Sequence, residues 1–240
     1  KALTVSGGKV ILRGRDEGVV QNTGTIDVSG EGSGSGGEVR LISGERAILG
    51  GKILARGGEL GGDGGFVELS SRGIVDLLGH VDAAAPQGKL GTLLIDPKNI
   101  VVADGGSSLV GESIINTTGA GGINFQTANI KLQADNDVTI LTPVNIANPM
   151  TSFTVQAGRS ILINNNVTTN NGAISMTAND PAFRELPLRD PGPPEILMAA
   201  GTTLNAGSGD ITLKIIPPTS LALAFTIGDA EAVVTEGQIW

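Results

Sequence analysis

Apolar and polar residues alternate strictly in short runs along the first hundred residues, and a glycine pair precedes most of these runs. The runs are Gly7-Gly8-Lys9-Val10-Ile11-Leu12, Gly36-Gly37-Glu38-Val39-Arg40-Leu41, Gly64-Gly65-Phe66-Val67-Glu68-Leu69 and, with one glycine replaced, Leu90-Gly91-Thr92-Leu93-Leu94-Ile95. Alternation with a period of two is typical of β-strands, and no helical period of three to four residues competes with it. The pattern predicts an all-β chain.

The runs recur at regular intervals. Val10, Val39, Val67 and Leu93 are separated by 29, 28 and 26 residues. Repeats of about 20 to 50 residues are typical of solenoids, in which each unit stacks on the next. Two further short strands follow each run, for example 47–49 and 52–55, and then 74–77 and 80–83. Three short strands separated by glycine-rich turns are the content expected of one β-helix coil.

Beyond residue 105 the turns change from glycine to asparagine, threonine and aspartate, as at 164–166 and 170–171. Ile130, Phe153, Ile174 and Ile196 are 23, 21 and 22 residues apart, which predicts tighter coils. Asparagine tolerates the left-handed conformation that such turns need. The strands expected here cover 123–125, 130–132, 138–140, 153–155, 161–163 and 174–176.

We therefore predict one right-handed parallel β-helix over residues 1–240, with about ten or eleven coils. It divides into glycine-rich coils at 1–103, an irregular excursion at 104–122, and Asn/Thr-rich coils at 123–240. Residues 180–194 hold five of the eleven prolines. Because proline cannot donate to an interior ladder, 181–195 is expected to project as a loop. This loop carries the residues suited to recognition, which are Phe183, Arg184, Glu185, Arg189 and Asp190.

Composition narrows the function. Aromatic residues are only 2% and the net charge is −8, which argue against nucleic-acid binding because that needs stacking platforms and cations. The absence of cysteine excludes disulfides and thiolate metal sites. No apolar run reaches the length of about 18 residues that a membrane-spanning helix needs. The chain starts at Lys1 without methionine, so we expect a processed or excised piece.

Several segments resemble the filamentous haemagglutinin family, the large exoproteins of two-partner secretion. These are the Gly-Gly-x-Val-x-Leu repeats, Gly91-Thr92-Leu93-Leu94-Ile95-Asp96-Pro97-Lys98-Asn99-Ile100, and the phrases at 132–140 and 155–161. The resemblance implies a right-handed parallel β-helix, export through an outer-membrane pore protein, and a role in adhesion, aggregation or biofilm. The Asn-Pro-Asn motifs of the family's secretion domain are absent, which indicates an internal segment. The family offers no catalytic residues to carry over.

Candidate sites are few, and each has a structural interpretation. Asp135 and Asp137 could form a carboxylate pair, but with Asn136 between them they favour a turn. Residues 61–65, Gly-Gly-Asp-Gly-Gly, are similar to a calcium-binding repeat but lack its register. The glycines of 30–37 precede a strand rather than a helix, which argues against a phosphate cradle.

His80 is the only histidine, so a histidine-rich metal site is excluded, and we expect it to face solvent. The chain has no GxSxG motif. No catalytic or metal-binding residue is therefore assigned, no cofactor is expected, and calcium is the one ion that the Asp- and Asn-rich turns would suit.

The function we predict is that of a structural rod in a secreted or surface-displayed bacterial adhesin. Its partners would be the export pore protein, cell-surface or matrix ligands and, by end-to-end association, other copies. Two alternatives remain: a carbohydrate-active β-helix enzyme, and a glycan- or receptor-binding module that acts through loop 181–195.

Overall fold

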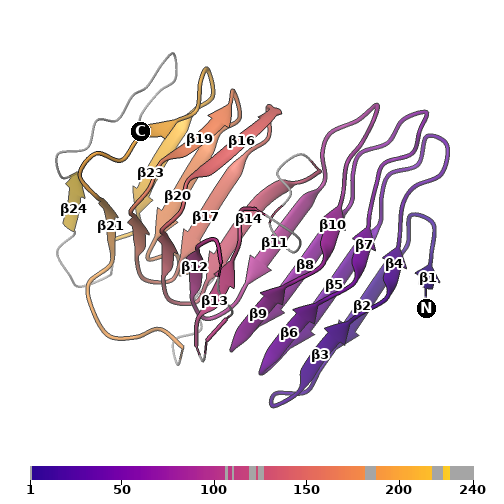
Figure 1. The fold of residues 1–240 in the computed structure, drawn as a ribbon, viewed down its shortest axis with the longest axis horizontal. Helices are drawn as coiled ribbons and strands as arrows, with labels where there is room; N and C mark the ends of the chain where they lie inside the picture. Colours follow the sequence, from indigo (N-terminus) through magenta and orange to yellow (C-terminus); the bar gives the residue numbers. More distant parts are fainter. Residues whose placement is uncertain are drawn as a thin grey trace.

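The computed structural model describes residues 2–105, 108–109, 111–118, 123, 127–181 and 188–217, and the backbone of 224–227. These residues form β-strands joined by turns, and none of them is helical. No segment of this part of the chain forms a helix that could cross a membrane. All pairings between the strands are parallel, and successive strands of one sheet lie side by side along the long axis of the molecule (Figure 1). The prediction of an all-β, parallel, solenoid-like architecture is confirmed at this level.

One sheet continues from end to end, and we call it the long sheet. It contains β2 (Lys9–Arg13), β5 (Glu38–Ser43), β8 (Phe66–Ser71), β11 (Thr92–Asp96), β14 (Asn129–Ala134), β17 (Phe153–Ala157), β20 (Ile174–Ala178) and β23 (Ile211–Ile215).

The other strands form two further faces. The second face contains β3 (Val19–Asn22), β6 (Arg46–Leu49) and β9 (Ile74–Leu77), and then β13 (Ser113–Ile115), β12 (Ile100–Val102), β15 (Val138–Ile140), β18 (Ile161–Ile163), β21 (Glu195–Met198) and β24 (Ala224–Ile227). The third contains β1 (Ala2–Thr4), β4 (Thr25–Asp27), β7 (Lys52–Leu54) and β10 (His80–Asp82), and then β16 (Val144–Pro149), β19 (Val167–Asn170) and β22 (Leu204–Asn205).

The early repeats stack in the register that the sequence predicts. Val10 pairs with Val39, Val39 with Val67, and Val67 with Leu93. The side chains at these positions point inward and are buried, as are their equivalents in later coils. Burying each such side chain is worth roughly 1.5 to 3 kcal/mol, so columns of stacked aliphatic residues stabilise the interior.

The glycine pairs are explained by close approach between coils. A Cβ on Gly37 would lie 2.0 Å from the Gly8 carbonyl oxygen, and one on Gly65 would lie 2.0 Å from that of Gly37. The same carbonyls accept ladder hydrogen bonds, since Phe66 N donates to Gly37 O at 3.0 Å. Only a residue without a side chain lets the chain bend at this point and keep the ladder intact.

Three expectations need correction. Ile196 does not continue the column of Ile130, Phe153 and Ile174, because it pairs with Ile161 on the second face. Ile211 is the true successor of Ile174, 37 residues later, because the proline-rich segment lies within that coil.

The excursion at 104–122 is not wholly irregular, since it contains β13, which pairs with β12. Of the strand expected at 123–125, only Ile123 lies within the described residues, and its side chain is buried.

The third correction concerns loop 181–195. Its residues 182–187, among them Phe183, Arg184 and Glu185, lie outside the described part of the chain. Residues 188–194, which we call the strap, do not project. They are held against the body by hydrogen bonds from Arg189, Asp190 and their neighbours.

Candidate functional site

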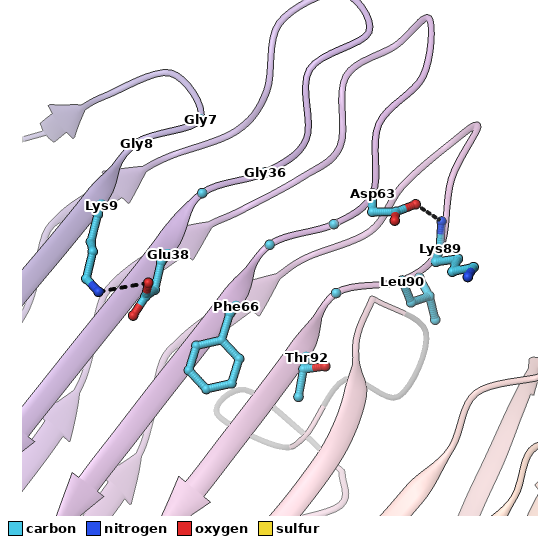
Figure 2. Close-up of a pocket in the computed structure, with 14 residues that line it drawn as sticks. Gly7, Gly8, Lys9, Gly36, Glu38, Asp63, Phe66, Lys89, Leu90 and Thr92 are labelled. Carbon is cyan, nitrogen blue, oxygen red and sulfur yellow. Dashed lines mark hydrogen bonds and ion pairs between the residues drawn. The ribbon is translucent and has the colours of Figure 1, made fainter.

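A shallow groove crosses the starts of four strands of the long sheet, and we call it the glycine groove. Its volume is 680 Å³, and Figure 2 shows its walls. The backbone of the stacked glycines forms its floor. The walls are the first side chains of the strands on one side and the stacked turns on the other: Lys9, Glu38, Phe66 and Thr92, facing Asp63, Lys89 and Leu90.

The carboxylate of Glu38 in this groove is already paired with cations. Lys9 Nζ lies 3.0 Å from Glu38 Oε2, and Arg40 also donates to Glu38. These hydrogen bonds, that from Arg40 first, hold the pKa of the Glu38 carboxyl below its usual value. A lowered pKa suits an ion pair rather than a general acid, which needs a proton near neutral pH.

Arg40 links the groove to the next coil. Its Nη1 lies 2.7 Å from Glu68 Oε2, and its guanidinium carbon lies 5.2 Å from the centre of the Phe66 ring. Burial raises the pKa of Glu68, and the positive charge of Arg40 opposes that rise. The network ties three adjacent coils together on the outer face of the long sheet.

The turns between the long sheet and the second face form a continuous line, which we call the corner ridge. It comprises residues 14–18, 44–45, 72–73, 97–99, 135–137 and 158–160. Backbone hydrogen bonds connect neighbouring turns, such as Ile74 N to Glu45 O at 3.0 Å and Asn136 N to Lys98 O at 2.9 Å. Neighbouring turns of the ridge therefore stack on one another, although the first is longer than the rest.

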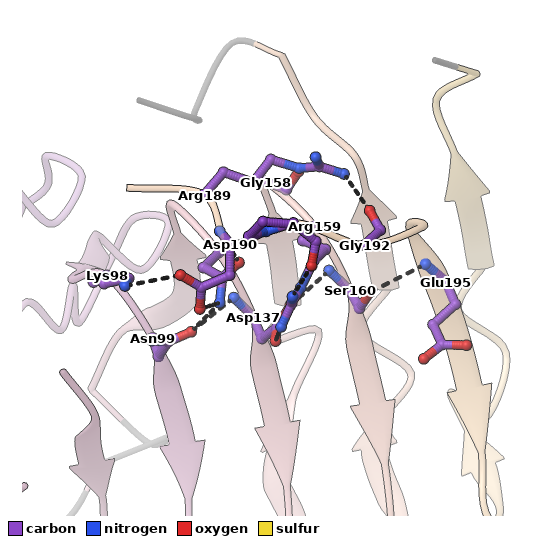
Figure 3. Close-up of polar contacts among 12 residues, drawn as sticks. Lys98, Asn99, Asp137, Gly158, Arg159, Ser160, Arg189, Asp190, Gly192 and Glu195 are labelled. Atoms are coloured by element: carbon purple, nitrogen blue, oxygen red, sulfur yellow. Dashed lines mark hydrogen bonds and ion pairs between the residues drawn. The ribbon is translucent and has the colours of Figure 1, made fainter. Parts of the chain in front are cut away.

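The strap lies on the ridge over the later coils (Figure 3). Asp190 accepts from Lys98 Nζ at 3.1 Å and from Asn136 Nδ2 at 3.0 Å, and its own N–H donates to Asn136 Oδ1 at 3.0 Å. Arg189 Nε donates to the carbonyl oxygen of Gly158 at 2.8 Å.

The contacts continue toward β21. Arg159 Nη1 donates to the Pro191 carbonyl at 2.8 Å, and Glu195 N donates to Ser160 Oγ at 3.2 Å. Arg159 also forms an ion pair with Asp137, whose carboxylate further accepts Ser160 N at 3.0 Å. The hydrogen bond to Asp137 raises the pKa of Arg159, so the guanidinium stays charged.

A second groove of 680 Å³ lies on the same ridge over the first three coils, and we call it the ridge groove. Its lining includes Asp16, Glu17, Glu45, Arg46, Arg72 and Leu188, the first strap residue. Arg72 Nη1 lies 3.5 Å from Asp16 Oδ1, and Arg46 forms an ion pair with Asp76.

The candidate residues from the sequence lie in turns and at strand ends, where they support the fold. Asp135 and Asp137 lie in a turn between β14 and β15, as the turn interpretation predicted, and Asp137 binds Arg159. Asp63 is exposed, and its carboxylate accepts Lys89 N at 2.8 Å. The glycines of 30–37 lie before β5. His80 begins β10 and is partly exposed rather than fully solvated. Among the described residues, no group of three or more His, Cys, Asp or Glu could hold a metal ion.

Sequence reasoning missed the network that fixes the strap. Lys98, Asn136 and Arg159 come from three different turns, and Asp190 lies 54 residues after Asn136. Lys98 and Arg159 lie in the segments that resemble the filamentous haemagglutinin family, so the sequence does draw attention to them. Nothing in the sequence indicates which carboxylates these two cations contact.

Comparisons with protein-family models, curated proteins and solved structures found no match for this chain.

Proposed function

We propose that this chain is a structural rod module of a secreted or surface-displayed bacterial adhesin, related to the filamentous haemagglutinins. The observation that carries the proposal is the long sheet, whose eight parallel strands keep one register across two long detours of the chain. Such a frame extends in one direction and is stabilised mainly by contacts between neighbouring coils, as in other repeat proteins.

The handedness and the number of the coils are part of the same proposal. The coils are right-handed, because crossover connections between parallel strands have that hand in about 98% of cases. The expectation of ten or eleven coils for the whole chain stays a prediction; the described residues supply eight strands to the long sheet. At ~4.8 Å per coil these eight strands span about 34 Å.

The paired charges favour this function over the alternative of a carbohydrate-active enzyme. Both grooves contain carboxylates beside basic residues, which is the residue content that such an enzyme would need. In the glycine groove, however, Glu38 is neutralised by Lys9 and Arg40. Receptor binding through loop 181–195 is less favoured than the rod function, because residues 188–194 of the loop are bound to the body.

We propose three kinds of partner: the export pore protein, ligands on cells or matrix and, by end-to-end association, other copies of the chain.

Surface display of the chain on a non-adherent bacterium tests the proposal. Cells that display it should aggregate, or bind matrix-coated plates, more than cells that carry the display anchor alone. Small-angle scattering of the purified chain should give the profile of a rod of constant cross-section. Equal adhesion in both strains would refute the adhesive role, and a scattering profile of a sphere would refute the rod.

A further inference from the structure

Met150 is an exposed methionine in the turn between β16 and β17. The residue is 74% exposed, whereas Met176 in β20 and Met198 in β21 are 0% and 2% exposed. The chain contains no cysteine and no methionine besides these three. The sulfur that solutes can reach in the folded chain is therefore the Sδ atom of one residue.

The backbone of Met150 holds an unfavourable conformation. Its φ is 59°, in the left-handed region, and the stacked turns of the next two coils contain Asn171 at φ 62° and Gly207 at φ 60°. Asparagine and glycine adopt this conformation readily, whereas for other residues it costs roughly 1 to 2 kcal/mol. Met150 N donates to Asn170 O at 2.9 Å, so the backbone fixes the turn. Packing of the exposed side chain does not offset the strain, and residues held in this way cluster at functional sites.

The other two methionines are protected by the fold. Met176 pairs in the long sheet with Val155 and Leu213, and Met198 pairs with Ile163 on the second face. Both side chains lie in the interior, so an oxidant reaches them only when the coils open. A sulfoxide at either position would also place a polar oxygen among aliphatic side chains, which costs free energy. Met150 meets neither obstacle, because its side chain lies in water.

We propose that Met150 is a modification site, at which hydrogen peroxide oxidises the thioether to a sulfoxide while the coils stay folded. The exposed apolar side chain thereby becomes polar and chiral, and a methionine sulfoxide reductase restores it. This proposal goes beyond the rod function and does not depend on it.

The oxidation needs no other co-reactant. The Sδ atom attacks one oxygen of the peroxide, so that a sulfur–oxygen bond forms and the oxygen–oxygen bond breaks. The departing hydroxide takes the proton of the transferred hydroxyl and leaves as water, and two electrons pass from the sulfur to the peroxide. In the reverse reaction a dithiol is oxidised to a disulfide, and the sulfoxide oxygen leaves as water.

The test follows the three methionines of the full chain during exposure to hydrogen peroxide. Samples are quenched with catalase and digested with trypsin, and mass spectrometry measures the oxidised fraction of each peptide. Cleavage after Arg159 and Arg184 puts the three methionines on separate peptides. Met150 should react about tenfold faster or more than the other two, because they react only through opening of the fold. In guanidinium the three rates should become similar.

Two matched variants and a repair step complete the experiment. Met150→Leu, a swap that conserves volume, should remove the fast reaction, and Met198→Leu should leave the rate at Met150 unchanged. Reductase and dithiothreitol should return the oxidised chain to its original mass, with an unchanged circular dichroism spectrum throughout. The proposal is overturned if Met176 or Met198 reacts as fast as Met150 in the folded chain, or if the difference persists in guanidinium. Loss of the folded spectrum on oxidation of Met150, or failure of the reductase to repair it, would also overturn the proposal.

Discussion

Replacing Gly65 with alanine tests whether close approach between coils is the reason for the glycine pairs. The added Cβ would lie 2.0 Å from the Gly37 carbonyl oxygen, whereas real Cβ contacts stay beyond 3.0 Å. The two backbones must therefore move apart by about 1 Å. The atom that is struck belongs to the backbone and cannot rotate away.

The expected cost follows from the bonds at this point. Gly65 N donates to Ala55 O at 2.7 Å, Phe66 N to Gly37 O at 3.0 Å, and Thr92 N to Gly65 O at 2.9 Å. Weakening two of these bonds at about 1 kcal/mol each, adding 1 to 3 for overpacking and subtracting about 0.7 for the less flexible unfolded chain, gives a destabilisation of roughly 2 to 4 kcal/mol.

Gly50→Ala is the matched control. A Cβ there would meet its nearest atoms only at 3.8 and 4.0 Å, in ordinary contact, and Gly50 has no left-handed backbone. This variant should be neutral or more stable by about 0.4 to 1 kcal/mol, because alanine restricts the unfolded chain.

Guanidinium unfolding followed by far-ultraviolet circular dichroism measures both variants. Amide hydrogen exchange at Phe66 and Thr92 should accelerate in Gly65→Ala even if the coils do not unfold as one unit, since repeat proteins can open locally. Equal unfolding midpoints for Gly65→Ala and the unsubstituted chain, or equal losses in both variants, would refute the close-approach argument.

Three further predictions concern single side chains. Thr151 is fully buried, and its hydroxyl has no hydrogen-bond partner among the described residues, so Thr151→Val should raise the free energy of unfolding by about 1 kcal/mol; a lower value in thermal unfolding would contradict this. Because Arg40 lowers the pKa of Glu38 in the folded state, that carboxylate stabilises the fold above its unfolded pKa and loses this effect as pH falls through the folded pKa. Glu38→Gln should therefore be less stable at pH 7 and equal to the parent chain near pH 2, and a constant difference in unfolding midpoints across that range would argue against the linkage. Lys98→Ala should speed trypsin cleavage after Arg189 and lower the free energy of unfolding by no more than about 1 kcal/mol, since the ion pair with Asp190 that it removes is partly exposed; unchanged cleavage would show that the strap does not need this anchor.

The first half of the fold could be predicted because each coil repeats the same local signal. Two glycines mark the bend, and the alternation that follows assigns Val39 and Val67 to the interior. A one-residue slip would expose the whole apolar set, so the register is strongly specified.

The second half of the fold was harder to predict, because an aliphatic residue in a short strand does not indicate which sheet that strand joins. Ile196 has the spacing expected of the long sheet, yet the proline-rich segment delays that strand until Ile211. The strap was missed for a related reason. Its anchors, Lys98 and Asn136, are polar turn residues, and only the stacking of distant coils brings them to Asp190.

The two detours of the chain have a practical consequence. From Leu93 to Ile130, and again from Ile174 to Ile211, the long sheet advances by one strand while the chain covers 37 residues. Extra length at these turns therefore leaves the neighbouring strands in place, and exposed turns are where foreign sequence is best tolerated. The same two positions are suitable grafting points for epitope tags or small reporter domains, which would decorate the molecule without lengthening it.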